Sequence, residues 1–135
     1  MDYKIEDIEG ISAIYGAKLR EQGITSVEAL LEKGAAPKGR DALAKATGIS
    51  EKLILKWTNH ADLFRINGIG PEFSELLEAS GVDTVKELRN RVAANLYAKL
   101  VEVNAKKKLT RRLPSESQIA DMIEQAKKLP PKMTY

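Results

Sequence analysis

Apolar residues recur every three or four positions along most of the chain, which is the spacing of one face of an α-helix. The stripe formed by Leu53, Ile54, Trp57 and Ala61 is an example, and a tryptophan on such a face usually belongs to the core. Glycine, proline and hydroxyl residues separate these stretches, as in short helices joined by turns. The pattern therefore predicts an all-α fold of about ten helices.

The sequence repeats itself at an offset of 58 residues. The offset aligns Gly10 with Gly68, Ile11 with Ile69, Tyr15 with Phe73, Leu19 with Leu77, Gly23 with Gly81 and Val27 with Val85. A repeat of this length indicates two copies of one supersecondary unit. We predict a first unit over residues 1–62, a second over residues 63–130 and a tail over residues 131–135. No glycine or proline lies between Trp57 and Gly68, so a shared helix is expected to join the units rigidly.

The turn of the second copy carries a candidate phosphate site. Gly68, Ile69 and Gly70 precede Pro71, and proline is favoured at the first position of a helix. Glycine tolerates positive φ and leaves backbone N–H groups uncovered by a side chain. Such N–H groups, at the positive end of a helix dipole, form a concavity suited to a phosphate oxygen.

The turn of the first copy carries the corresponding residues Gly10, Ile11 and Ser12. Ser12 stands where the second copy has Gly70, and its side chain restricts the backbone of the turn. Both turns are candidate sites, and the first is predicted to be the weaker one.

The second turn and the helix after it resemble the helix-hairpin-helix motif, whose pattern is aliphatic-x-Gly-aliphatic-Gly, then a small residue, Leu and Gly-aliphatic. The matching residues are Ile66, Gly68, Ile69, Gly70, Ser74, Leu77, Gly81 and Val82. The resemblance implies that hairpin amides hold a phosphate of the nucleic-acid backbone, so that no base sequence is read. It also implies a monovalent cation on the turn carbonyls from Asn67 to Gly70, and no other cofactor is expected.

Residues 4–63 are similar to a small five-helix, SAM-like domain found at the N-terminus of archaeal recombinases and in the C-terminal repeats of a bacterial transcription elongation factor. In that family Gly48, Ile49 and Ser50 correspond to a second, degenerate hairpin, which adds Gly48 to the candidate site residues. The whole chain also resembles an uncharacterised bacterial family, classed as a domain of unknown function, with tandem helix-hairpin-helix-like units. The resemblance implies two tandem five-helix units.

A cluster of cations interrupts the repeat. The net charge is +3, and residues 105–135 hold eight basic and three acidic side chains. The second copy carries an insertion over residues 104–114, which makes it about eight residues longer here than the first copy. We call its cations the basic run: Lys106, Lys107, Lys108, Arg111 and Arg112. The basic run is either a solvated loop or a second contact to a phosphate backbone.

Two functions remain open at this point. The first is binding of nucleic acid, with DNA expected before RNA, through the hairpin amides and the basic run. The second is a protein-interaction scaffold with degenerate hairpins. Three carboxylates favour the scaffold, because Glu72, Glu75 and Glu78 lie near one face of the helix after the better hairpin and repel phosphate. Retention on DNA or heparin, and its dependence on salt, distinguishes the two.

Catalysis, a small-molecule substrate and membrane insertion are not expected. His60 is the single histidine, and the sequence has no metal-ligand cluster and no glycine loop followed by Lys-Ser or Lys-Thr. Cysteine is absent, which excludes disulfides. The longest stretch without a charge is Gly10–Ala17, far shorter than the roughly 20 apolar residues of a membrane helix. The first residues do not form a signal peptide, so a cytoplasmic location is expected.

Overall fold

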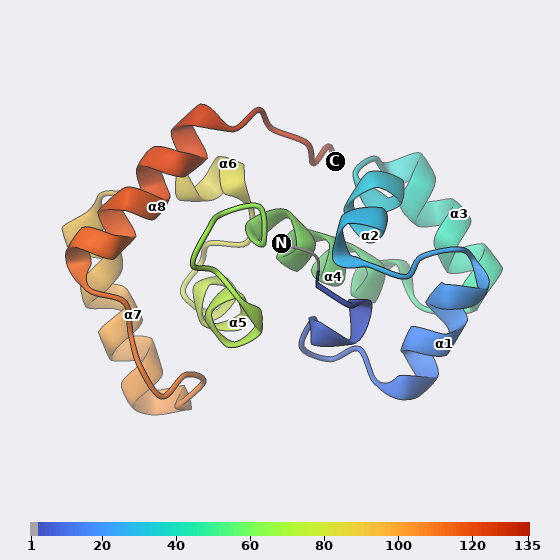
Figure 1. Cartoon of the computed structure of the whole chain (residues 1–135), viewed down its shortest axis with the longest axis horizontal. Coiled ribbons are helices and arrows are strands. Elements are labelled where there is room, and N and C mark those ends of the chain that lie inside the picture. The colour runs from blue at the N-terminus through green and yellow to red at the C-terminus, as the bar shows by residue number, and fades with distance from the viewer. Residues whose placement is uncertain (1–2) are drawn as a thin grey trace. The chain divides into compact units, whose positions relative to one another are not determined.

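The computed structural model describes residues 3–135, and its regular elements are helices (Figure 1). They are the 3₁₀ helix η1 (Ile5–Asp7) and the α-helices α1 (Ala13–Glu21), α2 (Val27–Gly34), α3 (Pro37–Thr47), α4 (Glu51–Leu63), α5 (Pro71–Ala79), α6 (Val85–Leu88), α7 (Ala93–Lys107) and α8 (Glu116–Lys128). The all-α prediction is confirmed, and the described residues form nine helical elements, η1 included, where about ten were expected. The reason is that α4 continues to Leu63, so the second copy has no separate helix corresponding to η1.

Contacts within the described residues divide the chain into two units. Unit 1 contains the chain up to Asp62 together with Lys132–Tyr135, and unit 2 contains Leu63–Pro131. The core of unit 1 includes Ile5, Ile8, Leu19, Ile24, Leu30, Ile54 and Trp57. The core of unit 2 includes Leu63, Ile66, Ile69, Leu76, Leu77, Val82, Leu100 and Ile119. Each unit therefore has its own, mostly aliphatic, interior.

The repeat in the sequence is also a repeat of backbone geometry. The bounds of α1 and α5 lie 58 residues apart, as do the first residues of α2 and α6. In the turns, Gly10 has φ +96° and Gly68 has φ +99°. The N–H of Ile11 donates to the carbonyl of Ile8 at 3.2 Å, and a bond of the same length forms in the second copy. The aligned glycine and apolar residues therefore produce the same local fold twice.

An ion pair reinforces the first copy. Arg20 donates to both carboxylate oxygens of Glu6, at 3.1 Å from Nε and 2.6 Å from Nη2. These hydrogen bonds hold the pKa of the Glu6 carboxyl below its ordinary value. Gly16 makes room for the pair, because a Cβ at this position would overlap the Glu6 carboxylate. The aligned positions of the second copy hold Phe64 and Glu78, so it has no such pair there.

The two copies differ most after α3 and α7. Helix α3 ends at Thr47 and is capped by Gly48, whose φ is +74°, whereas α7 continues to Lys107 and is capped by Lys108, whose φ is +52°. The insertion was expected to be a loop from residue 104, but its first residues are helical. The side chain of Asn104 closes the remaining loop, since it donates to the carbonyl of Thr110 at 3.0 Å and accepts from the Thr110 N–H at 3.1 Å.

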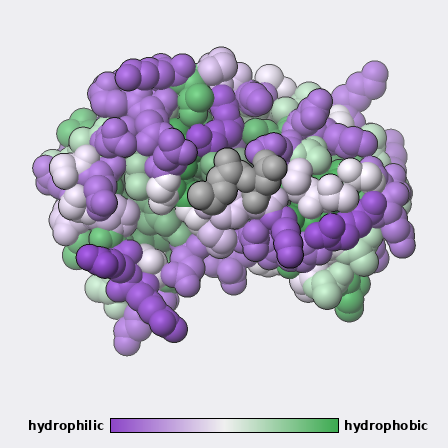
Figure 2. Space-filling model, viewed as in Figure 1, coloured by the Kyte–Doolittle hydropathy of each residue, from purple (hydrophilic) through white to green (hydrophobic). Residues whose placement is uncertain are grey.

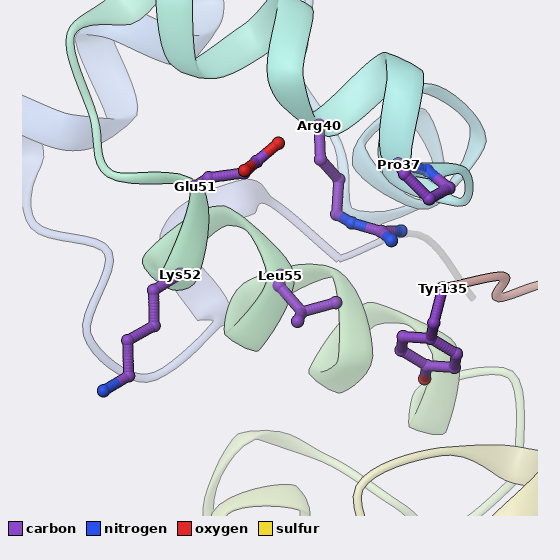
Figure 3. A pocket seen from close by; sticks show the side chains of 6 residues that line it. All are labelled: Pro37, Arg40, Glu51, Lys52, Leu55 and Tyr135. Atoms are coloured by element: carbon purple, nitrogen blue, oxygen red, sulfur yellow. The ribbon is translucent and has the colours of Figure 1, made fainter.

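The last residues, expected to form a tail, belong to unit 1. Arg40, which is buried, donates to the carbonyl of Gly34 at 2.8 Å and to that of Thr134 at 2.7 Å. The N–H of Thr134 donates to the carbonyl of Ala35 at 2.8 Å. The Arg40 guanidinium also lies 5.7 Å from the centre of the Tyr135 ring, and Figure 3 shows the two side chains near each other. The carbonyls at the end of α2, with the aromatic ring, therefore compensate a buried cation.

Trp57 connects the core of unit 1 to its turn. The side chain is 1% exposed, its ring centre lies 5.2 Å from that of Tyr15, and its Nε1 is 3.3 Å from the point where a Cβ on Gly10 would lie. The expectation that Trp57 belongs to the core is confirmed. His60, the single histidine, is also fully buried.

We predict that Trp57→Ala lowers the free energy of unfolding by about 3–5 kcal/mol, because it leaves a large cavity under the first turn. Chemical denaturation followed by circular dichroism measures this change. Trp57→Phe is the control, since it keeps most of the buried volume and should lose distinctly less. A loss of less than about 1 kcal/mol in the alanine variant contradicts the packing described here.

Candidate nucleic-acid interface

The second turn presents the N-terminus of α5 to solvent. Ile69 is 1% exposed and anchors the turn in the core of unit 2, while Gly68 on its outer side is exposed. Gly70 is the N-cap residue of α5 and Pro71 is its first residue. No side chain caps this end of the helix among the described residues. Pro71 has no N–H, and the Ser74 N–H donates to the Gly70 carbonyl at 2.9 Å. The N–H groups of Glu72 and Phe73 are therefore the ones left without an acceptor from the N-cap residue, as the phosphate prediction requires.

Helix α8 holds the other end of this turn. The Asn67 N–H donates to Oε1 of Gln125 at 2.9 Å, and Nε2 of Gln125 lies 3.4 Å from the Asn67 carbonyl. Gln125 also donates to Oδ2 of Asp121 at 3.0 Å, which fixes its amide. The carbonyl of Asn67, one of those expected to face a monovalent cation, therefore already accepts a hydrogen bond. No local pattern in the sequence marks Gln125, so its contact with the turn could not be predicted.

The first turn has the same backbone conformation as the second, but the helix that follows it starts with a different N-cap residue. Gly10 and Ile11 take the positions of Gly68 and Ile69, and Ile11 is 5% exposed. Ser12 is the N-cap residue of α1, and its hydroxyl accepts from the Tyr15 N–H at 3.4 Å. A side chain of the protein thus occupies the place that a phosphate oxygen would take. This geometry gives a physical reason for the prediction that the first turn is the weaker site.

Gly48 has a structural role in unit 1. Its left-handed conformation ends α3, and its N–H donates to the carbonyl of Ala44 at 2.9 Å. Ile49 is buried, and the hydroxyl of Ser50 accepts from the Leu53 N–H at 3.2 Å to cap α4. As in the first turn, a hydroxyl fills the acceptor position at the helix start.

The basic run lies on the surface of unit 2, and all five of its side chains belong to exposed residues. Figure 2 shows hydrophilic side chains projecting over the end of α7. The Lys106 ammonium lies 3.9 Å from the Glu102 carboxylate, an exposed pair that contributes little to stability. Cations at the C-terminal end of a helix also interact favourably with its dipole.

Two candidate segments far apart in the sequence meet in unit 2. Arg112 of the basic run and Gly68 of the second turn line the same hollow, together with Leu113, Pro114, Gln118 and Met122. Gly10, Ile11, Ser12 and Gly48 belong to unit 1 instead. The second turn and the basic run are therefore the parts of the predicted site that one unit brings together.

The carboxylates after the second turn differ in exposure. Glu72 is exposed in the first turn of α5, whereas Glu75 and Glu78 are half-buried. A carboxylate in the first turn stabilises the helix through its dipole but repels a phosphate at the same place. Glu72 is therefore the acidic residue that most directly opposes anion binding at Gly70.

Within residues 3–135, no cluster of three or more His, Cys, Asp or Glu side chains could hold a metal ion. The helices found in that range are also too short or too polar to cross a bilayer. Neither observation bears on the phosphate prediction, which depends on backbone N–H groups and cations.

The comparisons with known proteins place the chain in a family. The model of the family described as Domain of unknown function (DUF4332) matches residues 9–129. Because the match covers most of the sequence, the chain belongs to this family. No curated protein and no solved structure matches the chain.

Exchanging the two N-cap residues tests the difference between the turns. In Gly70→Ser, the new hydroxyl is expected to accept from the Phe73 N–H, as Ser12 accepts from Tyr15. This should raise the stability by about a few tenths of a kcal/mol and weaken oligonucleotide binding, because the phosphate position is filled. Ser12→Gly is the matched control, with a similar loss of stability and no loss of binding. Thermal unfolding and titration measure both effects, and unweakened binding by Gly70→Ser contradicts the assignment.

Proposed function

We propose that this member of the DUF4332 family is a nucleic-acid-binding module that contacts backbone phosphates without reading the base sequence. In this proposal the two copies are tandem helix-hairpin-helix units, and the turns at Gly10 and Gly68 are their hairpins. The second hairpin provides the main phosphate contact, and the basic run provides the charge around it. The role is binding and not catalysis.

The observation that carries the proposal is the shared hollow of Gly68 and Arg112. A phosphate held by N–H groups alone gains little in water, whereas a nearby guanidinium adds a charge-assisted contact. The uncapped start of α5 and the basic run thus combine two kinds of anion-binding group within unit 2. A solvated loop with no function has no need to lie beside the hairpin.

The basic run also suits a polymer better than a single anion. Its five cations extend from the last turn of α7, at Lys106 and Lys107, to Arg112 at the rim of the hollow. Successive cations can neutralise successive phosphates and release their counterions, which is the main source of nonspecific affinity. The absence of carboxylates between Lys106 and Arg112 keeps this stretch purely cationic.

A protein-interaction scaffold is the second candidate, and unit 1 favours it. Ile14 beside the capped first turn is 72% exposed, an unusual position for a large apolar side chain. Unit 1 also has a mostly apolar hollow next to the last residues of the chain, shown in Figure 3 and lined by Pro37, Arg40, Glu51, Lys52, Leu55 and Tyr135. The two candidates therefore point to different units of the chain.

Replacing the basic run tests the first candidate. If all five cations contact phosphate, log K against log salt should have a slope of about −4.5 for duplex and about −3.5 for a single strand. Substitution of all five by Gln or Ser should flatten the slope to near zero and leave the fold intact. Fluorescence anisotropy at several salt concentrations measures this.

The control removes the same charge from unit 1 by replacing Lys4, Lys18, Lys38, Lys45 and Lys52 with Gln. It should keep most of the slope, because the proposal assigns no phosphate contact to these side chains. If the slope falls equally in the two variants, net charge alone explains the salt dependence and the basic run is not a specific contact. No binding by the wild type at low salt would favour the scaffold instead.

A further inference from the structure

The hollow beside the second turn has features that phosphate binding does not require. Its volume is about 460 Å³, and its six lining residues come from the turn, the end of the insertion and α8. Phosphate contacts need only exposed N–H groups and cations, so a hollow whose lining is partly apolar is left unexplained. Its lining shows which further group it could take.

The lining offers apolar surface on several sides. Met122 comes from the core of unit 2 and is 6% exposed, while Leu113 and Pro114 are half-buried at the end of the insertion. Gly68 contributes only backbone, and a Cβ there would lie 2.9 Å from the Cε of Met122. The absence of a side chain at Gly68 therefore keeps this part of the hollow open.

The polar side chains of the lining are hydrogen-bond donors. Arg112 carries a guanidinium, which has donors and no acceptor. The Oε1 of Gln118 already accepts from the Ser115 N–H at 2.8 Å in the capping box of α8. Gln118 can offer a ligand its Nε2, a donor of two hydrogen bonds, while Oε1 keeps one further lone pair. None of the six lining residues is a carboxylate.

This combination suits a flat group with apolar faces and acceptor atoms on its edge, next to a phosphate. A nucleobase has these properties, with ring nitrogens and carbonyl oxygens at its edge. In a duplex, stacking covers the faces of the bases, so only an unpaired base can enter. We propose that the hollow takes an unpaired base, and hence that the module prefers single-stranded nucleic acid over duplex. This inference rests on the proposed function and adds the class of nucleic acid to it.

The preference is tested with three labelled probes of equal length: a single strand, the same strand with base-free residues, and the duplex. Anisotropy titrations at one low salt concentration compare their affinities for the full chain. Burial of part of one base face against the apolar lining should make the intact strand bind about tenfold more tightly than the base-free strand. It should also bind more tightly than the duplex, although the duplex has the higher charge density.

A pair of variants locates the effect. Gln118→Glu keeps the capping box, because a glutamate oxygen can accept from the Ser115 N–H, but it replaces the Nε2 donors by an acceptor. Ser117→Glu adds the same charge one residue away, in the same turn of α8. The first variant should lose the tenfold preference for the intact strand over the base-free strand, and the second should keep it.

The outcomes separate the two proposals. Equal affinity for all three probes overturns the base hollow and leaves phosphate binding standing. A preference for the intact strand that Gln118→Glu retains also overturns the hollow as the base site. No binding of any probe overturns both proposals.

Discussion

The structure depends on a backbone conformation that only glycine adopts without strain, at Gly10 and Gly68. With φ near +100° at both positions, the chain forms a turn closed by a 3.2 Å backbone hydrogen bond. The isoleucine that follows each glycine is buried, and a new helix starts two residues after it. Burial of Ile11 and Ile69 then fixes the turns against their cores. A side chain at either glycine would strain the backbone and weaken this anchoring at the same time.

Both copies share this glycine turn, but single residues make the surroundings of the two turns different. A hydroxyl at Ser12 satisfies the helix start in unit 1, and Glu6 with Arg20 clamps its first turn. In unit 2 the helix start at Gly70 has no side-chain cap. Gln125 of α8 instead accepts a hydrogen bond from the Asn67 N–H in the turn. The helix start of one copy is therefore capped by its own side chain, and that of the other has no side-chain cap. The same fold thereby supports different surfaces.

The spacing of glycine and apolar residues was enough to predict the helices and turns that depend on residues close together in the sequence. The 58-residue repeat predicted matching turns, because glycine and apolar residues act within a few positions of one another. The longer reach of α7 was missed, because Lys106 and Lys107 were assigned to a loop although both favour helix. Contacts such as those of Arg40 with Thr134 connect residues distant in sequence and leave no local signal.

The candidate site, like the fold, could be predicted from the sequence only in part. The second turn and the basic run could be named from residue type and spacing. Their meeting in one hollow could not, since it depends on how α8 and the insertion pack against the turn. The same holds for Met122 and Gln118, whose roles arise from the fold of unit 2.

Backbone amide shifts in ¹⁵N-labelled protein, recorded as a short oligonucleotide is added at low salt, test most directly whether the second turn is the phosphate site. The largest shifts are expected at residues 68–70, 72–73 and 111–113, with small shifts at the aligned residues 10–15 of the first copy. Largest shifts at residues 10–15, or binding that leaves residues 68–73 unchanged, would contradict the assignment of the second turn as the phosphate site.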